Sequence, residues 1–410
     1  MKILIYEHIS GGGYASQPIS RSVLAEGFGI LRTIVSDLKA AEHEITVLLD
    51  DSLSKLNPPL NADYIVPIFY SEEAKKLLVN IAKINDAILV IAPETGQTLQ
   101  SIVDLVKKTG KISLNCESKT IQKVIDKTVL YQILEKKGIS TPRTLVFNVT
   151  EDLMQIKREI KSKLSYPLVF KPVDGVSCNG LSMVQEEDQI AQAIKKIKIE
   201  SCNRLFIVQK FIHGETASVS LICAKSKALP LSLNQQIVKI GSPEDISSYE
   251  GGAVPFDHPF KEEAFALAAK TAACFSGLKG YVGVDLVLGK NKLFVMDVNP
   301  RLTTSYVGLS RIANFNVAQV GVNAILKDEL PTKTETNGFV CFSKLETPLP
   351  TISDFQRAAQ ISEVVSPPFP LNDNQKACGL IAGQGTSMED AGLRLEEAKK
   401  RLLNIITRGK

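Results

Sequence analysis

Residues 294–302, FVMDVNPRL, place oxygen-bearing side chains on a strand that otherwise looks buried. Side chains alternate between the two faces of a strand, so Asp297 and Asn299 are expected on the same face. Asp285 interrupts the preceding apolar strand, YVGVDLVL, and a tight turn at residues 289–291 would pair the two strands as a hairpin. The three side chains could then converge, and carboxylates buried together need a cation or basic groups beside them.

The chemical type of these donors indicates which cation that would be. Oxygen ligands without Cys or His nearby favour Mg²⁺ (or Mn²⁺) over zinc or copper. Arg301 directly follows the strand and could meet an anionic oxygen held by the metal. Ordinary strand-edge charges, paired with Lys290 or Arg301, explain this stretch equally well when it is taken alone.

A second pattern, in residues 169–184, is typical of a loop that covers phosphate groups. An apolar strand ends at Lys171, and small or acidic residues follow it in the loop: Asp174, Gly175, Ser177 and Gly180. Glycines let backbone amides approach a phosphate closely, and a lysine at the strand end supplies a point charge. A plain hairpin with a flexible loop is the alternative interpretation.

Other nucleotide motifs are weaker or absent. The sequence has no GxxxxGK[ST], and SGGGYASQ at 10–17 does not fit GxGxxG. That glycine-rich turn follows the first strand, where it could receive a substrate or part of a nucleotide. A structural turn is the alternative, and we favour the functional one. No Ser-His-Asp or Cys-His pairing points to a covalent nucleophile.

Composition narrows the class of protein. The chain has 410 residues, 44% hydrophobic and 22% charged, which is the balance of a globular protein. The chain has 48 Lys and Arg residues against 44 Asp and Glu residues. This excess of positive charge is too small to argue for nucleic acid or membrane partners. The seven cysteines form no CxxC, and no apolar run approaches the ~20 residues of a membrane span. We therefore expect reduced thiols in a cytoplasmic protein.

The order of elements predicts an α/β and α+β protein of several units. Strand patterns at 2–9, 44–50, 63–69, 86–92 and 111–115 alternate with helical patterns at 20–41 and 72–84. This alternation favours a doubly wound parallel sheet. The domains predicted from these patterns are 1–115, an N-terminal α/β domain; 116–337, with a small lid subdomain at about 145–212; and 338–410, a small β-rich unit. The last unit ends in a helix with a capping box at Ser387–Asp390.

The succession of these features is more specific than any one of them. It runs from Lys127 through Lys171 and the segment 210–215 to Asp285, Asp297 and Asn299. This order resembles the ATP-grasp superfamily, in which two α+β subdomains close on ATP. The resemblance covers about 115–330, preceded by an α/β domain of the kind that accompanies that fold.

The resemblance implies a role for each matching residue. Lys127 and Lys171 would contact ATP phosphates under the loop that contains Asp174, Gly175, Ser177 and Gly180. The adenine site would be formed by Gln209, Lys210 and Phe211, and Glu215 would bind the ribose. Asp285, Asp297 and Asn299 match the metal ligands, and Arg301 with Lys171 would be catalytic. Asp297 stands where glutamate is usual, and Lys210 stands where glutamate is frequent.

The implied reaction joins a carboxylate to an amine. The carboxylate attacks the γ-phosphorus of ATP, and the amine then displaces phosphate from the acylphosphate. Within the superfamily, MKILIYEHISGGGY, VFKPVDGVSCNG and FVMDVNPRLTTSY resemble most the archaeal tyramine–L-glutamate ligase group. The partners implied are therefore ATP, a small carboxylate such as L-glutamate and an amine such as tyramine, with a homodimer as a further possibility. A carboxylase-type enzyme acting on bicarbonate, a D-alanine–D-alanine-type ligase and a non-catalytic ATP-binding regulator remain open.

Overall fold

A parallel sheet with helices on both faces opens the chain. The computed structural model describes residues 1–175, 178–225, 227–371 and 376–407. The strands of this sheet, in spatial order, are β3 (Tyr64–Ile68), β2 (Glu44–Asp50), β1 (Lys2–Glu7), β4 (Ala87–Ile91) and β5 (Ile112–Ser113). Its helical segments are α1 (Arg21–Ala40), α2 (Asp51–Ser54), α3 (Ser71–Ala82), η1 (Thr95–Gln97) and α4 (Thr98–Lys108).

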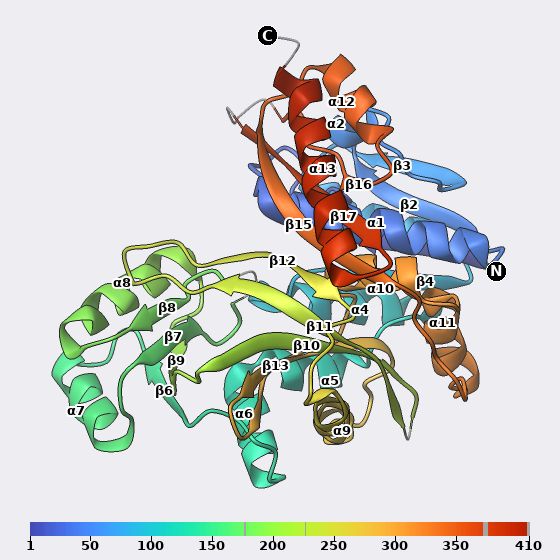
Figure 1. The fold of residues 1–410 in the computed structure, drawn as a ribbon. Coiled ribbons are helices and arrows are strands. Elements are labelled where there is room, and N and C mark those ends of the chain that lie inside the picture. The colour runs from blue at the N-terminus through green and yellow to red at the C-terminus, as the bar shows by residue number, and fades with distance from the viewer. Residues whose placement is uncertain (176–177, 226, 372–375, 408–410) are drawn as a thin grey trace.

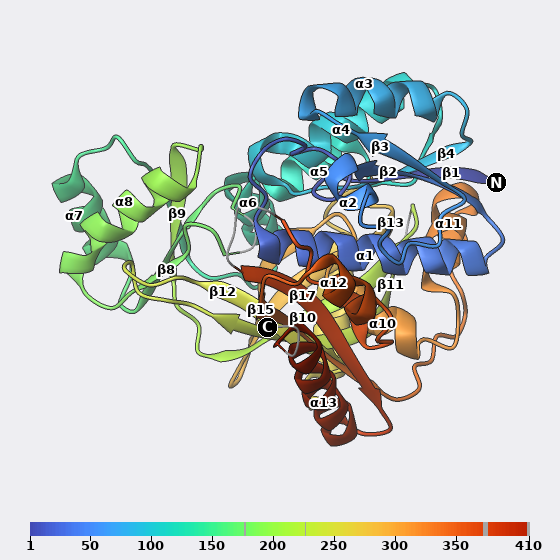
Figure 2. The same cartoon turned by 90° about the horizontal axis from the view of Figure 1, so that it is seen from above.

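The two faces of β1 explain why this strand is apolar throughout. Ile3 and Ile5 belong to the core that contains α1, whereas Leu4 and Tyr6 belong to the core that contains α3 and α4. Figure 2 shows the sheet between α1 and α3. A parallel strand covered on both sides reads as a continuous hydrophobic run. The predicted doubly wound sheet is confirmed, and α4 is a helix that the sequence patterns did not single out.

A smaller sheet forms a separate lobe, drawn in green in Figure 1. Its strands, in spatial order, are β6 (Thr144–Asn148), β9 (Leu205–Lys210), β7 (Leu168–Pro172) and β8 (Ser182–Val184). The helices α7 (Leu153–Lys163) and α8 (Ile190–Glu200), with η2 (Glu187–Gln189), complete this lobe. Phe147, Phe170 and Phe206 lie in a core of its own, with the rings of Phe170 and Phe206 stacked.

A long antiparallel sheet carries the hairpin that opened the sequence analysis. In spatial order it consists of β14 (Leu293–Asn299), β13 (Gly280–Gly289), β10 (Gly214–Cys223), β11 (Ala228–Lys239), β12 (Ser248–Val254), β15 (Phe339–Pro348), β17 (Lys376–Gly385) and β16 (Val364–Ser366). The associated helices are α5 (Ser118–Ile125), α6 (Lys127–Lys136), α9 (Lys261–Ala272), α10 (Tyr306–Ile312), α11 (Val317–Lys327), α12 (Ile352–Ala359) and α13 (Met388–Thr407).

The sheet continues across the boundary predicted at residue 338. β15 pairs antiparallel with β12, and Gly251 lies opposite Ser343. A Cβ at Gly251 would stand 2.1 Å from the Phe342 carbonyl oxygen, so only glycine allows the two strands to approach this closely. The C-terminal segment is therefore joined to the central sheet through its backbone, and Gly29 of α1 packs against Leu380 on the same side.

The start of α13 differs slightly from the predicted capping box. The Ser387 hydroxyl accepts the Asp390 N–H at 3.1 Å. The Asp390 carboxylate, however, accepts the N–H of Thr386 rather than that of Ser387. Each of the seven cysteines falls within the described residues and is a free thiol. Throughout the described part of the chain, no helix is both long and apolar enough to cross a bilayer.

Candidate active site

The hairpin β13–β14 brings the predicted oxygen donors together. Asp285 lies directly opposite Asp297, and Gly283 lies opposite Asn299. The Asn299 amide donates to one oxygen of Asp285 at 2.9 Å, and the Gln236 amide donates to the other at 3.0 Å. Burial, followed by the charge of Asp297, raises the pKa of Asp285 to about 6. Two half-buried carboxylates that face each other favour an added cation.

The donor atoms on the hairpin indicate which kind of metal ion could bind there. Within the described ranges, no group of three or more His, Cys, Asp or Glu side chains is arranged to hold a metal ion. The donors on the hairpin are two carboxylates and one amide, a set of hard oxygen atoms that suits Mg²⁺ together with phosphate oxygens. The residues present therefore fit a hard cation such as Mg²⁺.

Two lysines approach the hairpin from different elements. Lys127 is the first residue of α6, whose N-terminus is capped by the Asp126 carboxylate, and its side chain is buried against Asp297 in an ion pair. Lys171, at the end of β7, donates to the Tyr131 hydroxyl at 3.1 Å. That hydroxyl in turn donates to the carbonyl of Met296, next to Asp297. Burial lowers the pKa of Lys171, and the charges of Asp297 and Asp285 oppose the shift.

Arg301 has a partner that the sequence analysis did not identify. Its Nε and one terminal nitrogen donate to the two oxygens of Glu94 at 2.8 and 2.9 Å. Burial alone would lower the pKa of Arg301, but the charge and hydrogen bonds of Glu94, with the charges of Glu26 and Asp285, together outweigh it and the pKa is raised. Glu94 follows β4, at the carboxyl end of a parallel strand, where ligands bind in open α/β sheets. That position was the signal from which Glu94 could have been found.

A cavity of about 520 Å³ connects these groups. Its described lining includes most of the predicted site residues: Lys127, Lys171, Gly175, Gln209, Lys210, Phe211, Asp285, Asp297, Asn299 and Arg301. The lining therefore comes from the lid lobe, the antiparallel sheet and the loop after β4. A volume in this range is typical of a small-molecule or cofactor site.

Three predicted nucleotide contacts lie outside that lining. Asp174 accepts the Gly96 N–H at 3.1 Å, and the Gly180 N–H donates to Glu200 at 2.7 Å. Glu215 lies 3.3 Å from His258, with 58% of its side chain exposed. Alternation along β10 explains the position of Glu215, because its neighbours Gly214 and Thr216 line the cavity. Ser177 lies outside the described residues.

The glycine-rich turn after β1 is closely packed, as the alternative interpretation of a structural turn requires. A Cβ at Gly12 would stand 2.4 Å from Ile68, and one at Gly13 would stand 2.2 Å from the His8 ring. Gly12 also has φ +83°, a conformation that suits glycine. The described lining of the cavity includes no residue of this turn. The glycines therefore allow the chain to fold back on β1.

Further lining residues at the end of the cavity beside Arg301 come from segments far apart in the sequence. Glu26 of α1, Tyr249 of β12 and the segment Thr303–Ser305 all contribute. The Thr304 hydroxyl donates to a Glu26 oxygen at 2.8 Å. No motif singled out Glu26, because it lies in the second turn of an amphipathic helix with no functional pattern around it.

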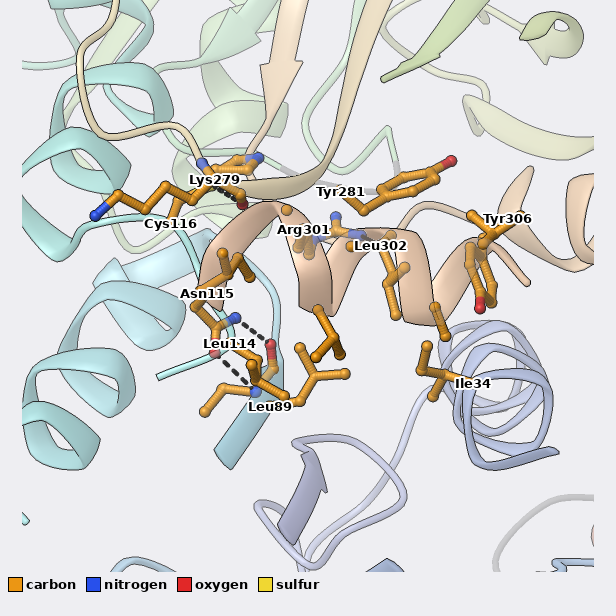
Figure 3. Close-up of a pocket in the computed structure, with 18 of the residues that line it drawn as sticks. Ile34, Leu89, Leu114, Asn115, Cys116, Lys279, Tyr281, Arg301, Leu302 and Tyr306 are labelled. Atoms are coloured by element: carbon orange, nitrogen blue, oxygen red, sulfur yellow. Dashed lines mark hydrogen bonds between the residues drawn. The ribbon is translucent and has the colours of Figure 1, made fainter. Parts of the chain in front are cut away.

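A second cavity, of about 50 Å³, lies behind Arg301 (Figure 3). Its wall is mainly apolar, and Asn115 forms hydrogen bonds of 2.9 and 2.7 Å with the main chain of Val90. The Cys116 thiol contacts the Lys279 carbonyl at 3.3 Å. This volume is far too small for a nucleotide, and the contact between Cys116 and Lys279 joins the end of the parallel-sheet unit to the neighbouring unit.

Comparison with known proteins agrees with this geometry. Residues 124–305 match the family described as ATP-grasp domain, and residues 43–121 match the pre ATP-grasp 3 domain. The chain is 27% identical over 339 residues to the tyramine–L-glutamate ligase of Methanocaldococcus jannaschii, which is 82% of this chain and 93% of that relative. The corresponding enzyme of Methanocaldococcus fervens is 28% identical over 82% of this chain and 98% of its own length.

A solved structure extends the likeness to the whole fold. The biotin carboxylase of Campylobacter jejuni superposes with a TM-score of 0.73 at 14% identity, covering 98% of this chain and 94% of that one. An identity this low supports the fold and not the reaction. With the hairpin, lysines and lid around one cavity, residues 124–305 resemble an ATP-grasp domain in both sequence and structure.

Proposed function

We propose that the protein is an ATP- and Mg²⁺-dependent ligase that activates a carboxylate as an acylphosphate and couples it to an amine. The observation that carries this proposal is the common cavity, in which two lysines face the oxygen donors of the hairpin and Arg301 lies beside them. The relatives named tyramine–L-glutamate ligase support the reaction class. They make L-glutamate and tyramine the first pair of substrates to test.

Asp285, Asp297 and Asn299 would hold the metal. Bound Mg²⁺ supplies positive charge that offsets the charge on the transferred phosphoryl group. In the protein itself, Lys127 pairs with Asp297, and the amides of Asn299 and Gln236 donate to Asp285. Binding of the nucleotide would thus exchange contacts within the protein for contacts with the metal and the phosphates.

The chain's own groups bind and orient the reactants. Lys171 sits at the end of a rigid strand and is aligned by Tyr131, so its ammonium group can meet a phosphate oxygen with little reorganisation. Arg301 is fixed by Glu94 and is placed to hold a carboxylate or acylphosphate oxygen. The segment 209–211 at the end of β9 would receive the adenine. Closure of the lid over this cavity would exclude water from the acylphosphate.

An ADP-release assay tests the proposal. Amino acids, with glutamate first, are paired with amines, with tyramine first, in the presence of ATP and Mg²⁺, and product masses are measured. We expect ADP release that needs both substrates, with a product whose mass equals their sum less one water. ADP release that depends on bicarbonate would instead assign the carboxylase reaction. ATP binding without turnover across the panel would indicate a regulatory protein, and either result would overturn the proposal.

A further inference from the structure

We propose that Glu26, in α1, binds the ammonium group of a substrate at the end of the cavity beside Arg301. The inference rests on the proposed function and names a side chain that recognises one of the two substrates. The source of the ammonium group is either the acceptor amine or the amino group of the acid. Both present the same chemistry to the protein, and the experiment below separates them.

The surroundings of Glu26 are those of a built site. Its side chain is only 14% exposed, yet it lines the cavity. One oxygen accepts from Lys344 at 2.8 Å and the other accepts from the Thr304 hydroxyl at 2.8 Å. A carboxylate offers about four acceptor positions, so the oxygen that meets only a neutral hydroxyl retains capacity for a charged donor. Two neighbouring elements thus hold the carboxylate in place and leave it room for a ligand.

The same cluster already binds a primary ammonium group, that of Lys344. Its Nζ contacts Glu26, donates to the Ser22 hydroxyl at 2.8 Å and lies 5.5 Å from the centre of the Tyr249 ring. A carboxylate, a hydroxyl and an aromatic face together are what a primary ammonium needs when it leaves water. Tyr249 also lines the cavity.

Glu26 lies close enough to Arg301 for the two charges to interact. The charge of Glu26 acts on Arg301, where it contributes to the raised pKa, and on Tyr249, where it adds to the effect of burial in raising the pKa. Both oxygens of Glu94, another carboxylate near Arg301, already accept from the guanidinium of Arg301. Glu26, in contrast, has one oxygen that accepts only from the neutral Thr304 hydroxyl, and a cationic substrate near Arg301 would bind to that oxygen.

Glu26→Gln tests the inference, with Glu73→Gln at an exposed position of α3 as the matched control. Apparent KM values for tyramine, glutamate and ATP are measured for both variants and the wild type. Hydroxylamine, which is largely uncharged at neutral pH, then replaces tyramine and traps the activated acid as a hydroxamate. That second assay reports acid activation alone and shows that the variant is folded.

We expect Glu26→Gln to raise the KM of one ammonium-bearing substrate at least tenfold while the KM of ATP stays within twofold. A rise for tyramine with normal hydroxamate formation places the amine at Glu26, whereas a rise for glutamate in both assays places the amino acid there. Unchanged KM values for both substrates, or an equal rise for ATP, would overturn the inference. Absence of turnover in the wild type would refute the proposed function itself, so the two failures can be told apart.

Discussion

Replacing Glu94 by glutamine probes the pairing that holds Arg301. The substitution keeps the size of the side chain, but one acceptor oxygen becomes an NH₂ group that cannot accept an arginine N–H. One of the two hydrogen bonds, at 2.8 and 2.9 Å, is therefore lost. A hydrogen bond to a charged group contributes ~1.5–3 kcal/mol. If Arg301 acts on the activated acid, kcat/KM for the acid should fall by about 10- to 150-fold.

Steady-state ADP release at varied acid concentration measures this effect, with thermal unfolding of the same preparation as a check on the fold. Glu117→Gln is the matched control, since Glu117 pairs with Lys279 at 2.7 Å but has 56% of its side chain exposed. An exposed pair contributes less than ~1 kcal/mol, so the control should retain its activity. Wild-type kcat/KM in Glu94→Gln would show that Arg301 needs no anchor and would refute the role assigned to the pair.

Three further predictions concern turnover, pH and stability. Lys171→Ala and Asp297→Ala should each reduce ADP release at least about 100-fold while the protein remains folded, and near-normal release in either would contradict the site. Burial lowers the pKa of His8 from 6.5 to about 4. The unfolded chain therefore binds a proton at His8 at a higher pH than the folded protein does, and the folded protein loses stability as the pH falls from 6.5 towards 4. Between pH 7 and pH 5 the free energy of unfolding should fall by about 2 kcal/mol because of His8. In urea unfolding, the free energy of unfolding of His8→Gln should depend less on pH by this amount, and the same pH dependence in wild type and variant would contradict the prediction. Lys344→Met leaves the Glu26 carboxylate without its ion-pair partner and should lower the free energy of unfolding in urea by ~3 kcal/mol. Lys163→Met, which removes an exposed ion pair, should lower it by less than ~1 kcal/mol. Similar decreases in the two variants would refute this difference between buried and exposed pairs.

Local patterns were sufficient for the parts of the fold that depend on near neighbours in the chain. The alternation of β1, α1 and β2 predicted a parallel sheet because each strand must be covered on both faces. The hairpin of Asp285 and Asp297 followed from strand alternation and a short turn, and the structure places the two residues opposite each other. In both cases the interacting groups are close in sequence or follow a simple period.

Contacts between distant segments could not be predicted in this way. Glu94 and Arg301 are separated by 207 residues, and Lys344 and Glu26 by 318. Which face of β10 borders the cavity depends on how the neighbouring strands and the lid pack. The sequence resemblance assigned Glu215 to the ribose without that information. The glycines at 11–13 looked like a ligand loop because close approach of a ligand and close packing of the chain require the same small residue.

The amino-acid sequence by itself determined the order of the units, the parallel sheet and the presence of two acids and an asparagine on paired strands. These depend on periodicity and on chemistry carried by single residues. Only the tertiary structure decided which charges neutralise one another and which line the common cavity. The physical reason is that the energy of a buried charge depends on its nearest partners in space, and those partners are brought together from every part of the chain.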